Sequence, residues 1–302
     1  MILMHTIIAV PFDETLAEFI GKKGSENSIT FFNRKLNDDV IVALQPSSIE
    51  DKFYALPQSM LLSDQIIVST KNMDKLFGEV IVACSLLKKR VIFTKDNDIA
   101  SILSNVKLEN HIFNDREELL NSITSYKSNG KNEDKTRIDI DKAFNVKGVG
   151  VVALGFVTKG TVKVHDEMLH NSGKKVIIRS IQSQDEDVKT ATKGTRVGLA
   201  LKGIDESDMQ KGDVLANTTI KPTKSITVQA NQSKFVTEQI ETGKVYFIAI
   251  GFSYVNATVE SIDGNKIKFN FDKLVPVEIN DEVIIIRTLV PRIFASGTII
   301  SV

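Results

Sequence analysis

The sequence predicts an α/β plus all-β protein, in which one layered α/β domain is followed by two β-barrel domains. Three observations support this prediction. Short apolar strands alternate with helical patterns up to about residue 126, a polar segment then interrupts every periodicity, and β-rich runs separated by glycine turns fill the rest of the chain. Alternating strands and helices are typical of layered α/β domains, and many short strands with turn signals are typical of barrels.

The α/β domain is expected over residues 1–130. Its candidate strands are short and rich in Val and Ile, as the buried strands of a mostly parallel sheet are. They are Thr6–Val10, Ile29–Asn33, Val40–Leu44, Gln65–Thr70, Arg90–Thr94 and His111–Asn114. The helical patterns between them are Glu14–Ile20, Lys75–Lys89, Ile99–Val106 and Arg116–Tyr126.

Residues 131–135 are expected to be a linker, because a charged segment that follows an Asn-Gly pair continues neither pattern. Residues 136–220 and 221–302 then each suit one small β-barrel. Pro222 marks the boundary between them. The turn Asp263–Asn265 lies between two alternating apolar runs, which predicts a β-hairpin.

Composition excludes several classes of protein. The 302 residues carry 38 basic and 38 acidic side chains, so a protein that coats nucleic acid through bulk charge is not expected, and DNA is not an expected partner. The single cysteine, Cys84, excludes an internal disulfide and is expected to be a buried apolar side chain. The histidines show no metal-binding spacing, so no metal and no cofactor are expected. Without a signal peptide or an apolar run of roughly 18 residues, we expect a cytoplasmic location and no contact with membranes.

Four segments, in the right order and spacing, resemble the second domain of elongation factor Tu and of SelB-type factors. They are Ile140–Gly155, Val176–Gln182, Ala191–Gly203 and Asp208–Ala216. Such a series is far more specific than any one glycine pattern. The final segment Val290–Ile300 resembles the last strand pair of the third domain in the same factors, more loosely. The resemblance implies a translation factor that binds tRNA or the ribosome.

The amino-terminal domain resembles a SelB-like archaeal subgroup that includes the factor described from methanogens that use pyrrolysine. The similar segments are Ile20–Thr30 and Gly78–Leu87. This resemblance implies a GTPase-like fold of the P-loop type. At about 130 residues, the domain is shorter than a complete translational GTPase domain.

The phosphate-binding loop of that fold is not recognisable. It requires Gly-x-x-x-x-Gly-Lys-Ser/Thr directly after the first strand, so that backbone N–H groups surround the phosphates. Here the first strand runs into Pro11, which has no N–H, and Asp13, whose carboxylate repels phosphate. The alternative loop Gly21–Ser25 follows a helical pattern instead of a strand, so we expect a solvated basic turn.

The other nucleotide motifs are altered as well. Ala43 stands where the family has the aspartate of its magnesium motif. The guanine-reading Asn-Lys-x-Asp matches the stretch from Thr94 to Asn97, which ends without the aspartate. Only Thr30 matches, at the first switch threonine, and a lone threonine in a strand is usually a strand residue. Because phosphoryl transfer depends on positioning and charge neutralisation, guanine nucleotide is not an expected partner.

The resemblance implies a pocket for the aminoacyl end of tRNA between the first two domains. Its residues correspond to Asp141, Phe144 and Arg196. Asp141 would pair with an α-amino group, Phe144 would form an apolar wall, and Arg196 would grip an anionic group. The alternative is that Asp141 caps a turn, Phe144 lies in the barrel core and Arg196 is a surface charge.

Lys174, Lys175 and Arg179 are candidates for contacts to RNA phosphates, although solvated strand charges explain them equally well. The hypothesis is a factor homologue of the Tu and SelB type that has lost GTP binding and hydrolysis. One alternative is a GTPase with an unorthodox nucleotide pocket. Another is a scaffold or regulator that kept the fold to contact a protein.

Overall fold

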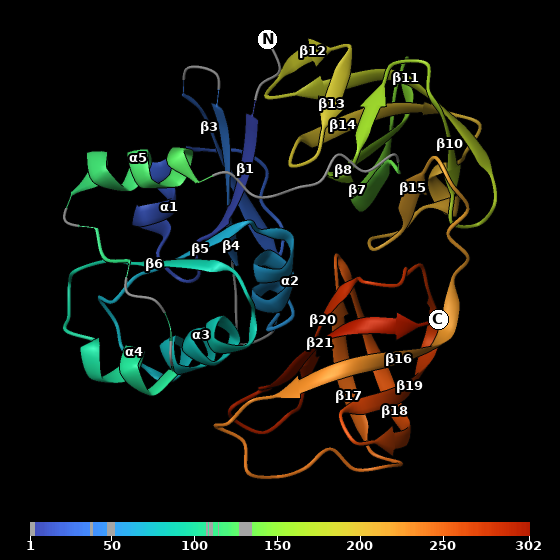
Figure 1. The fold of residues 1–302 in the computed structure, drawn as a ribbon. Helices are drawn as coiled ribbons and strands as arrows, with labels where there is room; N and C mark the ends of the chain where they lie inside the picture. The colour runs from blue at the N-terminus through green and yellow to red at the C-terminus, as the bar shows by residue number, and fades with distance from the viewer. Residues whose placement is uncertain are drawn as a thin grey trace.

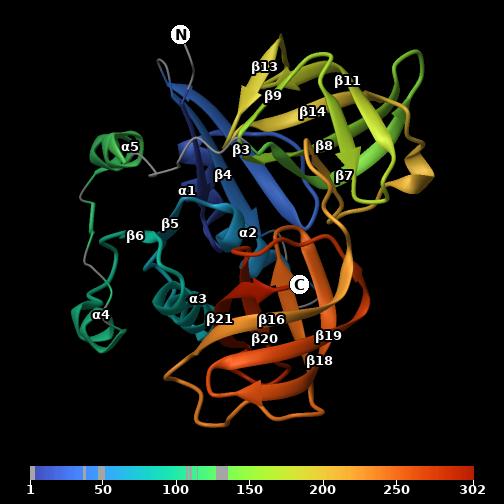
Figure 2. The same ribbon diagram turned by 45° about the vertical axis from the view of Figure 1, so that its right-hand side comes forward.

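The computed structural model describes residues 4–36, 39–46, 52–106, 108, 111–113, 115–126 and 135–302. An α/β domain and two β-barrels meet at a common junction (Figures 1 and 2). The predicted fold class is confirmed. Of the expected linker, residues 131–134 lie outside the described residues. No helix in the described part of the chain is long and apolar enough to span a bilayer.

The α/β domain contains a mixed six-stranded sheet in the order β2-β3-β4-β1-β5-β6. Neighbours in β4-β1-β5-β6 run parallel, and β2 and β3 form an antiparallel edge. The strands are β1 (Met4–Ala9), β2 (Lys22–Lys23), β3 (Ile29–Leu36), β4 (Asp39–Pro46), β5 (Gln65–Val68) and β6 (Arg90–Phe93). In place of the expected strand His111–Asn114, a single parallel bridge joins Phe93 to Ile112, and Asn114 lies outside the described residues.

Among the described residues of this domain, five helices lie against the sheet, in two layers. They are α1 (Glu14–Ile20), α2 (Ala55–Leu62), α3 (Lys75–Leu86), α4 (Ala100–Val106) and α5 (Arg116–Ser125). Successive side chains of β1 point to opposite faces of the sheet. Ile8 packs in a core with residues of α1 and α5, whereas Ala9 packs on the other face in a core with residues of α2 and α3. Cys84 of α3 is fully buried, as predicted.

Helix α2 was not expected from the sequence. Six of its residues, Ala55 to Met60, are buried, so no polar face reveals a helical period. Pro57 lies in its first turn, where a missing N–H costs nothing. The helix contacts both the sheet and the second barrel, which is why it is buried on all sides.

The first barrel closes through six strands, because β10 pairs with both β11 and β15. The strands of this domain are β7 (Arg137–Val146), β8 (Gly150–Lys159), β9 (Thr161–Lys163), β10 (Glu167–His170), β11 (Lys175–Ser183), β12 (Glu186–Val188), β13 (Thr190–Thr192), β14 (Arg196–Lys202) and β15 (Val214–Ala216). Its one described helix is a 3-10 turn, Glu206–Asp208. A Cβ at Gly155 would lie 2.3 Å from the Asp139 carbonyl oxygen, so only glycine fits where β8 crosses the irregular part of β7.

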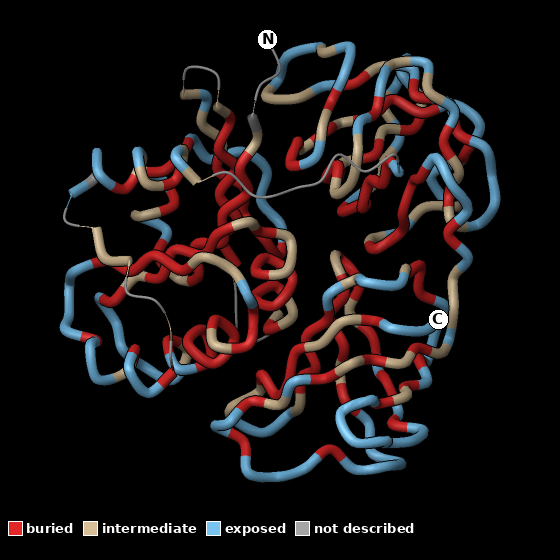
Figure 3. Tube along the Cα trace, viewed as in Figure 1, coloured by how far each residue is buried: buried red, intermediate tan, exposed pale blue. Residues whose placement is uncertain are grey.

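The second barrel is closed in the order β16-β19-β18-β17-β20-β21. Its strands are β16 (Thr223–Gln232), β17 (Val245–Ile250), β18 (Ser253–Asp263), β19 (Lys266–Val275), β20 (Glu282–Ile286) and β21 (Ile293–Ser301). The predicted hairpin is confirmed, since Asp263 pairs with Lys266 across the turn. Figure 3 shows buried segments in each barrel and in the sheet, with exposed chain on the outside.

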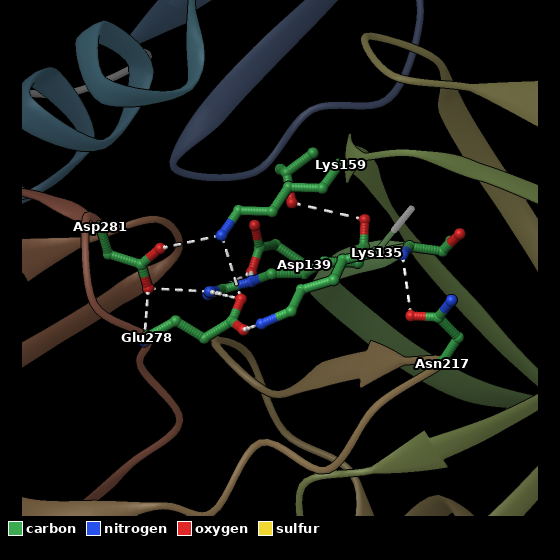
Figure 4. Close-up of polar contacts among 9 residues, drawn as sticks. Lys135, Asp139, Lys159, Asn217, Glu278 and Asp281 are labelled. Carbon is green, nitrogen blue, oxygen red and sulfur yellow. Dashed lines mark hydrogen bonds and ion pairs between the residues drawn. The ribbon is translucent and has the colours of Figure 1, made fainter. Parts of the chain in front are cut away.

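A buried ion-pair network joins the two barrels (Figure 4). Arg137 of β7 lies 2.8 Å from Asp281 and 2.9 Å from Asp139. Lys159 of β8 lies 3.0 Å from Glu278. Burial disfavours the charged form of Arg137, but the facing carboxylates of Asp139 and Asp281 outweigh it and raise the pKa of that guanidinium. A buried charge of this kind is stable only with its partners in place, so the network fixes the orientation of the barrels.

Two buried charges of the α/β domain reach the second barrel. Glu79 of α3 accepts hydrogen bonds from the backbone N–H groups of Arg292, at 2.6 Å, and Ile293, at 3.1 Å. The Lys89 ammonium donates to three carbonyl oxygens at the end of α2 and lies 3.7 Å from Glu282. Both side chains therefore bind backbone groups that are at least partly buried.

Replacing Glu79 by alanine should destabilise the protein strongly. The change leaves the N–H groups of Arg292 and Ile293 without acceptors, each costing about 1–3 kcal/mol, so we expect a loss of about 2–6 kcal/mol. Urea unfolding of Glu79→Ala measures it. The exposed Glu18→Ala serves as the control, with an expected change within about 0.5 kcal/mol. Equal stability of the two variants would contradict the anchoring role of Glu79.

Candidate functional site

The loop after β1 lies at the carboxyl edge of the parallel strands, where nucleotide-binding sheets hold their ligands. Pro11 opens the loop, and Phe12 follows with a φ of 65°. Asp13 is the N-cap of α1, and its Oδ1 accepts a hydrogen bond from the Leu16 N–H at 2.9 Å. Its Oδ2 lies 3.3 Å from the Lys71 ammonium. The protein's own carboxylate therefore takes the place at the helix terminus that an anion would need.

A cavity of about 410 Å³ lies beside this loop. Asp13, Glu14 and Asp74 line it, and Lys71 is the one cation among its lining residues. Asp74 is the N-cap of α3 and accepts from two backbone N–H groups of that helix. Both helix N-termini at the cavity are thus capped internally, and its carboxylates outnumber its cation. A triphosphate is held by free N–H donors and positive charge.

The remaining altered motif positions have roles inside the domain. Ala43 is fully buried in β4 and packs in the core shared with α1 and α5. The Thr94 hydroxyl accepts a hydrogen bond from the Thr70 N–H at 2.7 Å. The Asn97 amide donates to the Thr70 carbonyl at 2.6 Å. The stretch from Thr94 to Asn97, which matches the guanine-binding motif by position, is therefore hydrogen-bonded to the backbone just after β5.

The basic segment at Gly21–Ser25 was expected to be a solvated turn. Lys22 and Lys23 instead form the short edge strand β2, paired with β3, although both side chains are exposed as expected. Thr30 is buried in β3.

Asp141 and Arg196 lie together on the face of the first barrel that meets the α/β domain. Asp141 lies in the irregular part of β7 beside Gly155, and Arg196 pairs with the next residue of β8, Phe156. Burial lowers the pKa of Arg196 to about 10, and the nearby carboxylates of Asp141 and Asp185 oppose this shift.

Phe144 lies apart from this pair. It pairs with Val152, four residues along β8 from Phe156, which is about 13 Å at a rise of about 3.3 Å per residue. Its ring is half-buried, and the Lys142 ammonium lies 5.7 Å from the ring centroid. The structure thus brings together two of the three residues expected in the pocket.

Both charges of the pair contact the protein itself. The Arg196 guanidinium lies 3.6 Å from the centroid of the Phe31 ring, and its Nη2 donates to the Ser25 hydroxyl at 2.5 Å. Asp141 lies 3.2 Å from the Lys211 ammonium. Lys211 was not expected at this site, since nothing in its local sequence indicates that it reaches β7.

The three candidates for RNA phosphate contacts are exposed side chains of the first barrel, on β11 and the turn before it. Lys174 lies 2.5 Å from Asp208, and Lys175 lies 2.7 Å from Glu167. Arg179 donates to the Val149 carbonyl at 2.9 Å. Each cation therefore has a partner within the barrel.

Comparison with known proteins identifies the family. Residues 150–216 match the family model of elongation factor Tu domain 2. The chain is 30% identical over 286 residues to the uncharacterized protein MJ0325 of Methanocaldococcus jannaschii, covering 90% of this chain and 92% of that one. It is 39% identical over 95 residues to the selenocysteine-specific elongation factor of Haemophilus influenzae. The chain belongs to the SelB-like elongation factor Tu family.

The fold of this SelB-like protein agrees with that assignment. The crystal structure of SelB from Methanococcus maripaludis with the GTP analogue GppNHp superposes with a TM-score of 0.82, at 21% identity, over 100% of this chain and 80% of that one. The similarity to the Haemophilus factor covers 31% of this chain and 15% of the relative.

His5 of β1 gives the interface between the α/β domain and the first barrel a pH dependence. A Cβ at Gly194 would lie 2.9 Å from the His5 carbonyl oxygen, so the barrel backbone lies close against β1. The ring Nδ1 is buried without a hydrogen-bond partner in the described structure. Burial disfavours the charged ring and lowers the pKa of His5 from 6.5 to about 4.

The free energy of unfolding should therefore decrease as the pH is lowered from about 6.5 to about 4. In that range the unfolded chain binds a proton at His5 and the folded chain does not. The fall in the pKa of His5 from 6.5 to about 4 corresponds to at most about 3.5 kcal/mol, at about 1.4 kcal/mol per pKa unit. His5→Asn should remove this contribution from the pH profile of thermal unfolding. His165→Asn, at an exposed histidine, is the control and should keep the wild-type profile.

Proposed function

We propose that this protein is a SelB-like translation factor homologue that binds aminoacyl-tRNA or the ribosome and neither binds nor hydrolyses GTP. One contrast carries the proposal. At the carboxyl edge of the parallel strands the helix N-termini are capped by the protein's own carboxylates, while the first barrel carries a charged pair at Asp141 and Arg196. We further propose that its functional units are residues 1–130, 136–220 and 221–302, and that it acts in the cytoplasm.

The proposed loss of nucleotide binding is supported by the charges and the hydrogen-bond donors at the N-terminus of α1. A triphosphate bound at α1 would have to displace the Asp13 carboxylate from the Leu16 N–H and from Lys71. Pro11 offers no N–H in exchange, and Glu14 and Asp74 would stand beside the phosphates. Phosphoryl transfer needs charge neutralisation at that point, so the same arrangement opposes catalysis.

The RNA-binding half of the proposal is supported by the chemistry of the pair. A carboxylate beside a guanidinium presents an acceptor for an α-amino group and a fork of donors for an anionic group. We propose Phe144 as a wall of the same pocket, reached by the long aminoacyl end. Lys174, Lys175 and Arg179 are proposed as phosphate contacts, because exposed ion pairs exchange partners at little cost.

A scaffold role is the second candidate. Arg196 contacts Ser25 and Phe31, and Asp141 contacts Lys211. Both charged side chains therefore have partners within the protein, which favours this role. A measurement of RNA binding distinguishes the two candidate functions, because only the translation factor homologue is expected to bind RNA.

Calorimetric titration with GTP or GDP and magnesium should show no saturable binding. Because both helix N-termini carry internal caps and Lys71 is the one cation among the lining residues of the cavity, we expect no dissociation constant tighter than about 10 μM, which corresponds to about −7 kcal/mol. SelB from Methanococcus maripaludis, whose complex with a GTP analogue is known, serves as the positive control. Tighter binding by this protein would refute the loss of the nucleotide site.

The protein should slow the spontaneous hydrolysis of an aminoacyl-tRNA ester, and Arg196→Ala should weaken that protection. Loss of a charge-assisted contact is worth about 1.5–3 kcal/mol, or roughly tenfold to a hundredfold in affinity. Lys202→Ala changes an exposed cation of the same strand and should have no effect. Each variant needs a melting curve. If wild type and Arg196→Ala bind charged and uncharged tRNA equally, with unchanged melting, the scaffold role is favoured.

A further inference from the structure

A second cavity of the α/β domain, of about 520 Å³, lies beside the start of β6. Strands β5 and β6 run parallel and begin at Gln65 and Arg90, so this cavity lies at the amino edge of the parallel strands. The loop after β1 lies at the opposite, carboxyl edge. Among the described residues that line the cavity, Lys88, Lys89 and Arg90 are cations and none is a carboxylate. Its charge is therefore opposite to that of the cavity beside α1.

The guanidinium of Arg90 is held in place by uncharged groups. Its Nη1 donates to the Gln65 Oε1 at 2.8 Å and to the Ser122 carbonyl oxygen at 2.7 Å. Its Nη2 donates to the Ser122 hydroxyl at 2.7 Å. Both Nη atoms thus bond to one residue of α5, and Nη1 has no further hydrogen to donate. The side chain is fixed before any ligand binds.

Two donors of Arg90 remain. A guanidinium has five N–H groups, and the three bonds to Gln65 and Ser122 leave the Nε–H and one Nη2 N–H without a partner among the described residues. These two groups lie side by side, away from Gln65, and form the fork that binds a carboxylate or a phosphate with two parallel hydrogen bonds. The structure therefore leaves the anion-binding side of this arginine free.

The positive charge of the cavity is not balanced within the described structure. None of the partners of Arg90 is a carboxylate, and burial disfavours its charged form and lowers its pKa. Lys88 is exposed and has no ion-pair partner among the described residues. Lys89, in contrast, already donates to carbonyl oxygens at the end of α2. Arg90 and Lys88 are thus the two cations available to a ligand.

Much of the remaining lining is apolar. The Tyr126 ring centroid lies 5.5 Å from the guanidinium carbon of Arg90. The aliphatic and sulfur-containing side chains of the lining are Cys84, Leu87, Val91 and Leu108. Sites for small molecules typically have volumes of about 300–1,000 Å³, with apolar walls and a few polar groups that orient the ligand. The cavity thus suits a ligand with an anionic end and an apolar or aromatic body.

We propose that this cavity binds a phosphomonoester, whose phosphate lies between the free fork of Arg90 and the ammonium of Lys88 and whose organic group packs against Tyr126. A phosphomonoester carries nearly two negative charges and three acceptor oxygens, so it can bond to both cations at once. The fork alone would occupy both oxygens of a carboxylate. This site is separate from the proposed site for aminoacyl-tRNA and does not depend on it.

The side-chain Nε–H signal of Arg90 in a nitrogen–proton NMR spectrum reports on the fork directly. Titration of the full chain with phenyl phosphate should shift this signal to saturation, with a dissociation constant on the order of 0.1–1 mM for such a partly solvated site. Inorganic phosphate should bind about 3–10-fold more weakly, because it lacks the apolar group. The Nε–H of Arg287 already donates to the Pro291 carbonyl and should not shift. An unchanged Arg90 signal, or an equal shift with sodium chloride at the same ionic strength, overturns the proposal.

Lys88→Ala should weaken the binding of phenyl phosphate by about 3–10-fold, because it removes one charge-assisted contact. Lys75→Ala, at an exposed lysine in the first turn of α3, is the matched control and should bind as wild type does. Arg90→Lys keeps the charge, removes the fork and identifies the NMR signal. Lys88→Ala leaves the bonds of Arg90 intact, so the test holds even if Arg90→Lys does not fold. Equal affinity of wild type and Lys88→Ala, with equal melting temperatures, overturns the proposal.

The phosphate has two chemical sources, a small phosphomonoester and the 5′-phosphate of an RNA. A trinucleotide with a 5′-phosphate is therefore compared with the same trinucleotide without it. If the phosphorylated form binds more tightly than phenyl phosphate, the site is for an RNA end, and if it binds more weakly, the site is for a small ligand. If neither the trinucleotide nor phenyl phosphate shifts the Arg90 signal, the phosphate site is refuted and the proposed translation function is unaffected.

Discussion

The structure depends on the packing of three rings, one from each domain. Phe31, Phe156 and Phe252 are buried against one another where the sheet meets both barrels. Burying a large aromatic side chain is worth about 1.5–3 kcal/mol, and offset or tilted ring pairs contribute about 0.5–1.5 kcal/mol more. These ring contacts cross the boundary between the α/β domain and the first barrel and the boundary between the two barrels, so the positions of Arg196 and Lys211 at the two ends of the row follow from them.

Buried charges add orientation to this apolar contact. Arg137 needs Asp139 and Asp281, Lys89 needs the carbonyl oxygens at the end of α2, and Glu79 needs two N–H groups of the β21 region. Apolar surfaces tolerate sliding, whereas a desolvated charge that loses its partner is strongly destabilising. These side chains therefore hold the domains in one arrangement, around helix α2.

At the carboxyl edge of the parallel strands, aspartate side chains of the protein cap the helix N-termini. A helix N-terminus needs acceptors for its unpaired N–H groups, and at α1 the side chain of Asp13 supplies one. Lys71 then balances the added charge, at 3.3 Å. The same solution recurs at α3, where Asp74 is the cap. A neighbouring loop is likewise held by hydrogen bonds within the domain, since Thr94 and Asn97 both bond to the backbone of Thr70.

Local patterns in the sequence were enough for most of the fold. Helix α1, the hairpin at Asp263 and the β-rich second half follow from periodicity and turn residues, which act over a few neighbours. The altered residues Pro11, Asp13 and Ala43 were also visible, because a motif is a matter of residue identity at fixed spacing.

Features that depend on packing between distant parts of the chain could be learned only from the tertiary structure. Helix α2 carries no amphipathic signal because the sheet and the second barrel cover it on different sides. The sequence alone indicated Arg196 and Asp141 as site residues, but not that Ser25, Phe31 and Lys211 engage them. Those contacts join residues 70 to 171 positions apart, and they exist only because three domains pack at one junction.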